Sequence, residues 1–130
     1  MAVGILLVTH EGIGTALRGV AERLLMPVPL RIEVFEVGFD ADPDAVLPMA
    51  SAALRRADSG DGVLVLTDLF GASPANIASR LSRLGTPIRR VSALNLPMLL
   101  RVLNYADLEL DALPAVAVAG GRNGVQLDDA

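Results

Sequence analysis

Short apolar runs alternate along the chain with amphipathic stretches. The runs are aliphatic, are bounded by glycine, proline or charged residues, and predict strands at residues 2–9, 31–37, 63–67 and 90–94. Between them, apolar residues recur at every third or fourth position and predict helices at residues 13–24, 43–57, 73–84 and 97–104. The alternation predicts an α/β fold, with an open, doubly wound sheet of four parallel strands. The strand order expected from this fold class is 2-1-3-4.

Turn and cap residues support the helix boundaries. Asp42-Pro43 and Ser73-Pro74 each read as an N-cap followed by a proline in the first helical turn. Pro48 is expected to kink its helix or delay the regular part, because proline supplies no N–H.

The last quarter of the chain admits two interpretations. Residues 110–119 fit a helix, yet residues 116–118 also fit a strand. Gly120-Gly121 predicts a break, and residues 124–127 predict a last short strand.

Composition narrows the classes of function. The 130 residues fit one domain, 1–130, with an aliphatic core. No apolar stretch reaches the roughly 20 residues that a membrane span requires, which indicates a cytoplasmic protein without direct membrane insertion. The net charge is −4 and the arginines are scattered, which argues against a nucleic-acid partner. With no cysteine and a single histidine, the chain is not expected to build a metal centre.

The single histidine, His10, ends the first predicted strand. Imidazole can carry a proton or a phosphoryl group near neutral pH, and ligands of open α/β sheets bind just outside the carboxyl ends of the strands. In the order 2-1-3-4, the first and third strands are neighbours whose connections leave in opposite directions. His10 would then meet Asp68, which follows the third strand. A histidine that only bonds the backbone at a strand end is an equally good interpretation of its placement.

Three kinds of chemistry fit these residues to different degrees. A serine hydrolase with Ser73 as nucleophile is rejected, because Pro74 has no N–H for an oxyanion hole. A receiver-like signalling domain phosphorylated on Asp68 matches the topology, but the first strand ends without an acidic pair for magnesium and the chain has no lysine. The third interpretation makes His10 the phosphoryl acceptor and donor. Asp68 would hold one ring nitrogen as a donor and leave the other as a nucleophile.

Four segments carry a resemblance to a known family. Residues 8–10 (VTH), 68–76 (DLFGASPAN), 95–99 (NLPML) and 121–125 (GRNGV) together resemble the mannose-type EIIA component of the bacterial phosphoenolpyruvate:sugar phosphotransferase system. The resemblance implies a phosphotransferase component that acts through a phosphohistidine intermediate. Whether it would serve sugar uptake or a regulatory phosphorelay stays open.

The resemblance also assigns roles to individual residues. It implies that His10 accepts phosphate from the phosphohistidine of HPr and passes it to an EIIB component, and that Asp68 orients the histidine. It implies that Gly71, Ala72 and Ser73 line the phosphoryl site. Backbone N–H groups can stabilise a phosphoryl group without a metal ion, so no cofactor is expected.

Two further expectations concern contacts with other proteins. The resemblance implies a homodimer in which residues 124–127 cross to the partner's sheet as an antiparallel strand, with helix before it. An apolar rim around the site is expected to exclude water when a partner docks, and the candidates are Phe70, Leu96 and Met98; packing of these loops against the core is the alternative. Glu11 departs from the family, whose members often have glycine after the histidine, and its effect on phosphate transfer is left open.

Overall fold

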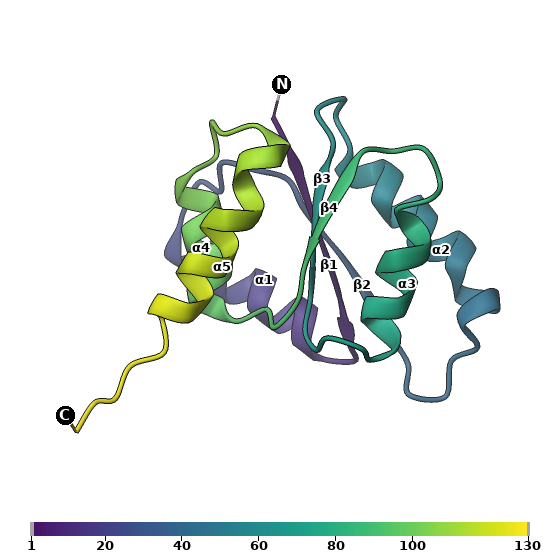
Figure 1. Cartoon of the computed structure of the whole chain (residues 1–130), viewed down its shortest axis with the longest axis horizontal. Helices are drawn as coiled ribbons and strands as arrows, with labels where there is room; N and C mark the ends of the chain where they lie inside the picture. The colour runs from purple at the N-terminus through teal and green to yellow at the C-terminus, as the bar shows by residue number, and fades with distance from the viewer. Residues whose placement is uncertain (1, 130) are drawn as a thin grey trace.

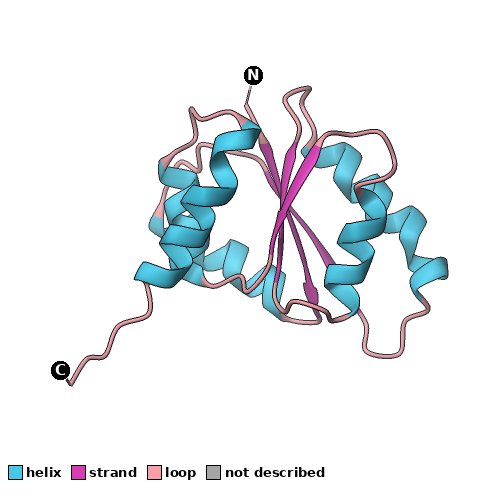
Figure 2. Ribbon diagram, viewed as in Figure 1, coloured by secondary structure: helices cyan, strands magenta, loops and turns pink. Residues whose placement is uncertain are grey.

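The computed structural model describes residues 2–129 and shows one sheet between two layers of helices (Figure 1). Its parallel strands, drawn in magenta in Figure 2, run in the order β2-β1-β3-β4. Their bounds are β1 Gly4–His10, β2 Ile32–Val37, β3 Val63–Thr67 and β4 Ile88–Val91. The predicted fold class and strand order are therefore confirmed.

The helices cover both faces of the sheet. They are α1 Ile13–Leu24, α2 Pro43–Ala57, α3 Ser73–Leu81, α4 Leu96–Asn104 and α5 Leu113–Asn123, the last preceded by a 3₁₀ turn at Leu110–Ala112. Helices α2 and α3 lie on one face, and α1, α4 and α5 lie on the other (Figure 1). None of the helices within residues 2–129 is long and apolar enough to cross a bilayer.

The central strand β1 is buried on both faces, which explains its unbroken apolar sequence. Ile5 and Leu7 pack into the core shared with α4 and α5, whereas Leu6 and Val8 pack into the core shared with α2 and α3. The strand therefore has a fixed position between two cores, and its last residue, His10, is held at the carboxyl edge of the sheet.

Helix α2 ends against the start of β1. A Cβ on Gly4 would overlap the carbonyl oxygen of Ala57, the last residue of α2. Pro48 lies inside α2 without interrupting it. The absence of a side chain at Gly4 thus sets how closely the helix approaches the sheet.

The sequence predicted the wrong boundaries for two elements, strand β4 and helix α3. Strand β4 begins at Ile88 and ends at Val91, whereas the sequence predicted a strand at 90–94. Ala93 takes a φ of 69°, which an extended strand cannot contain. The predicted helix at 73–84 ends at Leu81, and the following residues form tighter turns, with Leu84 N–H donating to the Leu81 carbonyl.

Ser73 is not the N-cap of α3. The cap is Ala72, which makes no side-chain cap bond, and Ser73 is the first helical residue. By contrast, Asp42 caps α2 as predicted, with its side chain accepting a hydrogen bond from the backbone N–H of Asp44.

The predicted break at Gly120-Gly121 is also wrong, because both glycines lie inside α5. A Cβ on Gly120 would sit 2.5 Å from the Cβ of Arg101, and one on Gly121 would sit 2.9 Å from Cε of Met98. The glycines are there because α5 packs closely on α4. The ambiguity at 110–119 is resolved as a 3₁₀ turn followed by helix.

Residues 124–127 form no strand within the described chain. They leave α5 as an exposed extended tail, clear of the sheet (Figure 1). A strand needs a neighbouring edge to satisfy its backbone groups, and this tail reaches no strand edge among residues 2–129. The expectation that it pairs with a second chain stays a prediction.

Gly4→Ala and Gly19→Ala test the close approach of α2 to β1. We expect Gly4→Ala to lower the free energy of unfolding by about 1–3 kcal/mol, because the added methyl group forces backbone apart. Gly19 lies in α1, where a methyl group added to it would have nothing within 4 Å, so Gly19→Ala should raise the free energy of unfolding by about 0.5–1 kcal/mol. Urea denaturation measures both, and equal effects would contradict this account of Gly4.

Candidate functional site

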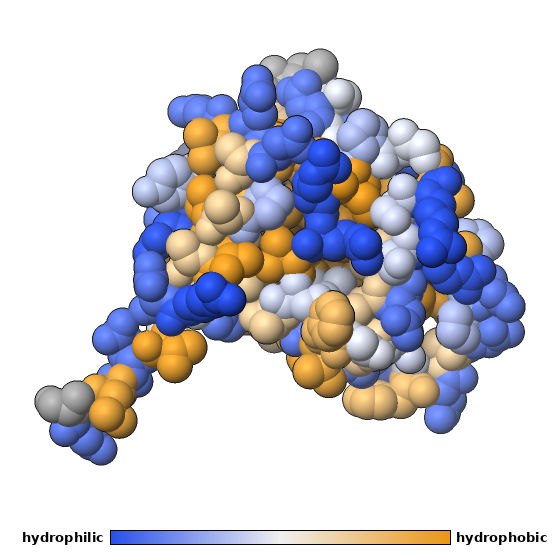
Figure 3. Space-filling model, in the orientation of Figure 1, coloured by the Kyte–Doolittle hydropathy of each residue, from blue (hydrophilic) through white to orange (hydrophobic). Residues whose placement is uncertain are grey.

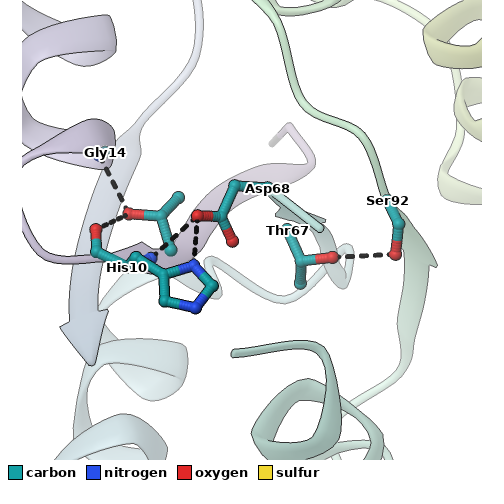
Figure 4. A network of polar contacts seen from close by, with 6 residues as sticks. His10, Gly14, Thr67, Asp68 and Ser92 are labelled. Atoms are coloured by element: carbon teal, nitrogen blue, oxygen red, sulfur yellow. Dashed lines mark hydrogen bonds and ion pairs between the residues drawn. The ribbon is translucent and has the colours of Figure 1, made fainter. Parts of the chain in front are cut away.

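His10 and Asp68 meet at the carboxyl edge of the sheet, between β1 and β3 (Figure 4). Nδ1 of His10 lies 2.7 Å from Oδ2 of Asp68. The histidine side chain is 23% exposed and the aspartate side chain 8% exposed, so the pair is half-sheltered while the ring still reaches the surface. The structure therefore brings together the two residues that the sequence placed at the switch point.

Asp68 also binds the backbone of the histidine. The same Oδ2 accepts a hydrogen bond of 3.0 Å from the backbone N–H of His10. A carboxylate accepts, so Nδ1 of the neutral ring carries the proton and Nε2 keeps its lone pair. Oδ1 of Asp68 is buried and has no hydrogen-bond partner among residues 2–129.

Thr9 shapes the turn that follows the histidine. Its buried hydroxyl donates to the carbonyl of His10 over 2.8 Å and accepts from the backbone N–H of Gly14 over 2.9 Å (Figure 4). One side chain thus joins the end of β1 to the first turn of α1. Sequence reasoning missed this role, although a hydroxyl residue just before the turn was a signal for it.

Glu36 supplies the cap that α1 lacks in its own sequence. The N-cap of α1 is Gly12, with a φ of 88° and no side chain. The Glu36 carboxylate reaches across from β2 and accepts a hydrogen bond of 2.9 Å from the backbone N–H of Thr15. The backbone N–H groups of Thr15 and Gly12, in that order of importance, hold the pKa of Glu36 below its usual value. The helix end beside His10 is therefore fixed from the neighbouring strand.

Phe39 covers one face of the histidine. The two rings are stacked, with centroids 5.3 Å apart and an angle of 29° between their planes. Sequence reasoning missed this contact. The strand register could have indicated it, because His10 lies opposite Val37 and Phe39 follows two residues later.

The predicted phosphoryl loop leads from β3 into α3. Gly71 takes a φ of 84°, which favours glycine, and Ala72 caps the helix. The first intrahelical bond runs from Asn76 N–H to the Ala72 carbonyl, so the N–H groups of Ser73 and Ala75 are free by the geometry of a helix start. Pro74 contributes none. This helix start therefore offers backbone donors that suit an anion.

A small hollow of about 170 Å³ lies beside this loop. Phe70 and Gly71 line one side, and Arg90 and Ser92 of the β4 segment line the other. The Thr67 hydroxyl lies 2.8 Å from the Ser92 hydroxyl within it (Figure 4). No group of three or more acidic or histidine side chains in residues 2–129 is placed to hold a metal ion.

The three predicted docking residues differ in exposure. Phe70 is 85% exposed, whereas Leu96 is partly buried and packs against the core. Met98 is 3% exposed and belongs to the core beneath α5, so the prediction that it forms part of a docking rim is wrong. Met98 instead packs against the core, which was the alternative interpretation of these residues.

Asn95 has a structural role at the start of α4. Its Oδ1 accepts from the backbone N–H of Met98 over 2.9 Å, and its Nδ2 donates to the Gly121 carbonyl over 3.2 Å. The sequence pattern at 95–99 therefore caps one helix and ties it to the next.

The fold and the site define a class of protein: doubly wound α/β domains that present one carboxylate-held histidine at the switch point of the sheet. A family described as "PTS system fructose IIA component" (EIIA-man) matches residues 4–118. The chain belongs to the mannose-type EIIA family of the phosphotransferase system.

Individual relatives agree with this membership. The chain is 32% identical over 133 residues to the mannose-specific EIIAB component of Escherichia coli, a match that covers 97% of this chain and 39% of that protein. It is 30% identical over 116 residues to the transcriptional regulatory protein LevR of Bacillus subtilis, a match that covers 85% of this chain and 12% of that protein. The chain thus spans well under half the length of these curated relatives.

The fold is shared with a solved structure. A mannose/sorbose specific IIA subunit of the phosphotransferase system from Enterococcus faecalis matches with a TM-score of 0.87 at 21% identity, over 100% of this chain and 97% of that one.

The pH dependence of stability tests the Glu36 cap. A carboxyl group whose pKa is lowered by folding stabilises the native state above its unfolded pKa, near 4.5, and loses that effect as the pH falls through its lower native pKa. At pH 7 we expect Glu36→Gln to lower the free energy of unfolding by about 0.3–1 kcal/mol, with the difference from wild type shrinking below pH 4.5. Glu22→Gln, on the exposed side of α1, is the control and should leave the free energy of unfolding at pH 7 within about 0.5 kcal/mol of wild type. A constant difference for Glu36→Gln down to pH 3 would count against the charge effect.

Proposed function

We propose that this chain is a phosphoryl carrier that accepts phosphate on Nε2 of His10 from phospho-HPr and passes it to an EIIB component. The observation that carries the proposal is the 2.7 Å contact between Nδ1 of His10 and Oδ2 of Asp68. That contact leaves Nε2 as the nucleophile at the surface. Family membership supports phosphotransfer as the chemistry.

The transfer is a displacement at phosphorus. The lone pair of Nε2 forms a bond to the phosphorus of the donor phosphohistidine, and the bond from phosphorus to the donor nitrogen breaks, returning its electron pair to the donor ring. The His10 ring becomes positively charged as it gains the phosphoryl group, with its proton still on Nδ1. The Asp68 carboxylate stabilises that charge and holds the ring in line. Transfer to the EIIB component reverses these bond changes at His10.

The loop of Gly71, Ala72 and Ser73 is the proposed phosphoryl-binding segment. The free N–H groups at the start of α3 suit the phosphoryl oxygens, and the exposed Ser73 hydroxyl is a further donor. The interaction of an anion with an exposed helix N-terminus is worth about 0.3–1 kcal/mol. That free energy is enough to position the phosphoryl group but not to drive its transfer. We propose that these donors act without a metal ion or other cofactor.

A receiver-like role for Asp68 is less well supported. Its Oδ2 already accepts two hydrogen bonds from His10, and its Oδ1 is buried. A phosphoryl acceptor oxygen has to be open to the donor. The geometry of the pair therefore favours an orienting role for Asp68.

Relatives of two kinds bear on the biological role. One is called a mannose-specific EIIAB component and another a transcriptional regulatory protein. We propose that the carrier works in the cytoplasm, either in sugar uptake or in a regulatory phosphorelay. The exposed Phe70 beside the loop is the proposed contact for docking proteins, together with the partly buried Leu96 at the start of α4.

We further propose that the chain forms a homodimer through its tail. Val125 and Leu127 are each 77% exposed, and the sheet ends at β4, whose outer edge pairs with no strand in residues 2–129. A groove of about 800 Å³ runs between that edge and α5, lined by Val91, Pro114 and Val118 among others. A tail from a second chain would bury its apolar side chains in this groove. Its backbone would also form hydrogen bonds with the unpaired N–H and C=O groups at the outer edge of β4.

Phosphoryl labelling tests the carrier proposal. With phosphoenolpyruvate, enzyme I and HPr, we expect an acid-labile, alkali-stable phosphate on His10. Asp68→Asn should slow labelling by roughly two to four orders of magnitude, because Asn keeps the hydrogen-bond shape but lacks the charge. His10→Ala should abolish labelling.

Other labelling results would overturn parts of the proposal. A hydroxylamine-sensitive acyl phosphate on Asp68 would favour the receiver-like alternative. Labelling of Asp68→Asn at the wild-type rate would remove the orienting role, while leaving His10 as the acceptor.

Tail variants test the dimer. In a strand, Val125 and Leu127 point to the same side and Gln126 to the other. We expect Val125→Ser combined with Leu127→Ser to shift the protein from dimer to monomer in analytical ultracentrifugation, as deletion of residues 124–130 should. Gln126→Ser is the matched control and should remain a dimer. A wild-type protein that sediments as a monomer at micromolar concentration would contradict the proposal.

A further inference from the structure

Phe39 is an exposed aromatic residue with one specific contact. Its side chain is 78% exposed, yet its ring stacks on His10 with centroids 5.3 Å apart. It belongs to neither of the two core clusters. Its one ring-to-ring contact within the described chain is with the residue proposed to carry phosphate.

The turn that contains Phe39 packs closely against the turn that follows His10. β1 and β2 are paired so that His10 lies opposite Val37, and each strand is followed by a turn just beyond that pair. A Cβ on Gly38 would sit 2.8 Å from Oε1 of Glu11, so the missing side chain leaves room for the Glu11 carboxylate. The two turns therefore pass each other closely, which places Phe39 over the imidazole.

Phosphorylation changes the charge of the ring that Phe39 covers. The neutral ring has a proton on Nδ1 and a lone pair on Nε2. When that lone pair bonds to phosphorus, the ring becomes a cation and the electron pair of the broken bond stays with the donor ring. The face of a phenyl ring is the negative end of its quadrupole and attracts a cation within about 6 Å of its centroid.

Asp68 and Phe39 act on the ring in different directions. The carboxylate of Asp68 contacts the ring at its edge, through Nδ1, and a hydrogen bond at one edge atom does not by itself fix the tilt of the ring plane. The stacked phenyl ring lies against the face and opposes that tilt. Together they leave Nε2 as the open edge.

We propose that Phe39 is a positioning residue that stabilises the phosphorylated form of His10 relative to the unphosphorylated form. The inference rests on the proposed function, because it concerns the same transfer. A cation over an aromatic face at an exposed site corresponds to a shift of about two- to fivefold in the equilibrium constant. The phosphoryl equilibrium with a donor protein is therefore displaced toward this chain by Phe39.

The stack itself is tested first, on the unphosphorylated protein. His10 is the one histidine of the chain, so its ring proton resonances are unambiguous. The ring current of Phe39 should shift them upfield in wild type and in Phe39→Tyr, and the shift should be lost in Phe39→Leu. Tyr105→Leu, which removes an exposed aromatic ring distant in sequence from the site, is the control and should leave the resonances unchanged. Identical His10 resonances in wild type and Phe39→Leu would overturn the inference.

The equilibrium is tested second. Phospho-HPr is mixed with wild type or with each variant until the composition no longer changes. The phosphorylated and unphosphorylated forms of HPr and of the tested protein are then quantified, which gives the equilibrium constant for transfer. Phe39→Leu keeps an apolar side chain but lacks the π face, so the equilibrium constant for transfer to His10 should fall about two- to fivefold. Phe39→Tyr should stay at the wild-type value, as should Tyr105→Leu. Loss of the stack in Phe39→Leu with an unchanged equilibrium constant would overturn the inference.

Failure of the proposed function would look different. In that case wild type would take no phosphate from phospho-HPr on His10, a result obtained before any variant is compared.

Discussion

The hydrogen bond between Nδ1 of His10 and Oδ2 of Asp68 is the contact on which the site depends. It forms because Val8 of β1 lies opposite Thr67 of β3, so Asp68, which follows Thr67, lies beside the last two residues of β1. If β1 shifted by one residue in that register, His10 would turn to the other face of the sheet, away from Asp68. The geometry of the site is thus set by the pairing of two buried strands and not by the loops.

The burial of β1 on both faces enforces that pairing. Because each face packs against a different helical layer, β1 cannot slide without exposing apolar residues on both sides. The helices that follow β1 and β3 then lie on opposite faces, and the edge between the two strands stays open (Figure 1). Figure 3 shows that apolar side chains also reach the surface of the molecule, where single exposed residues are normal in a globular protein.

Much of this arrangement could be predicted from the sequence, and the exceptions have physical causes. Apolar runs and proline-bounded turns located the elements, and strand order then brought His10 to Asp68. The end of β4 could not be predicted, because it depends on the φ of Ala93. Gly120-Gly121 looked like a break because a local pattern does not show the close packing of two helices. Phe39 and Glu36 act across strands, so their roles appear only once the pairing of β1 with β2 is known.

The bond from Asn95 to the Gly121 carbonyl fixes where the chain leaves the last helix. Helix α5 runs down to the same edge of the sheet as the arrowhead of β1, whereas the chain enters β1 at the opposite edge (Figure 1). An affinity tag or fluorescent protein joined to the C-terminal tail would therefore crowd the edge that bears His10. The same fusion at the N-terminal end would stand a full strand length away, which makes that end the better attachment point for surface immobilisation or imaging.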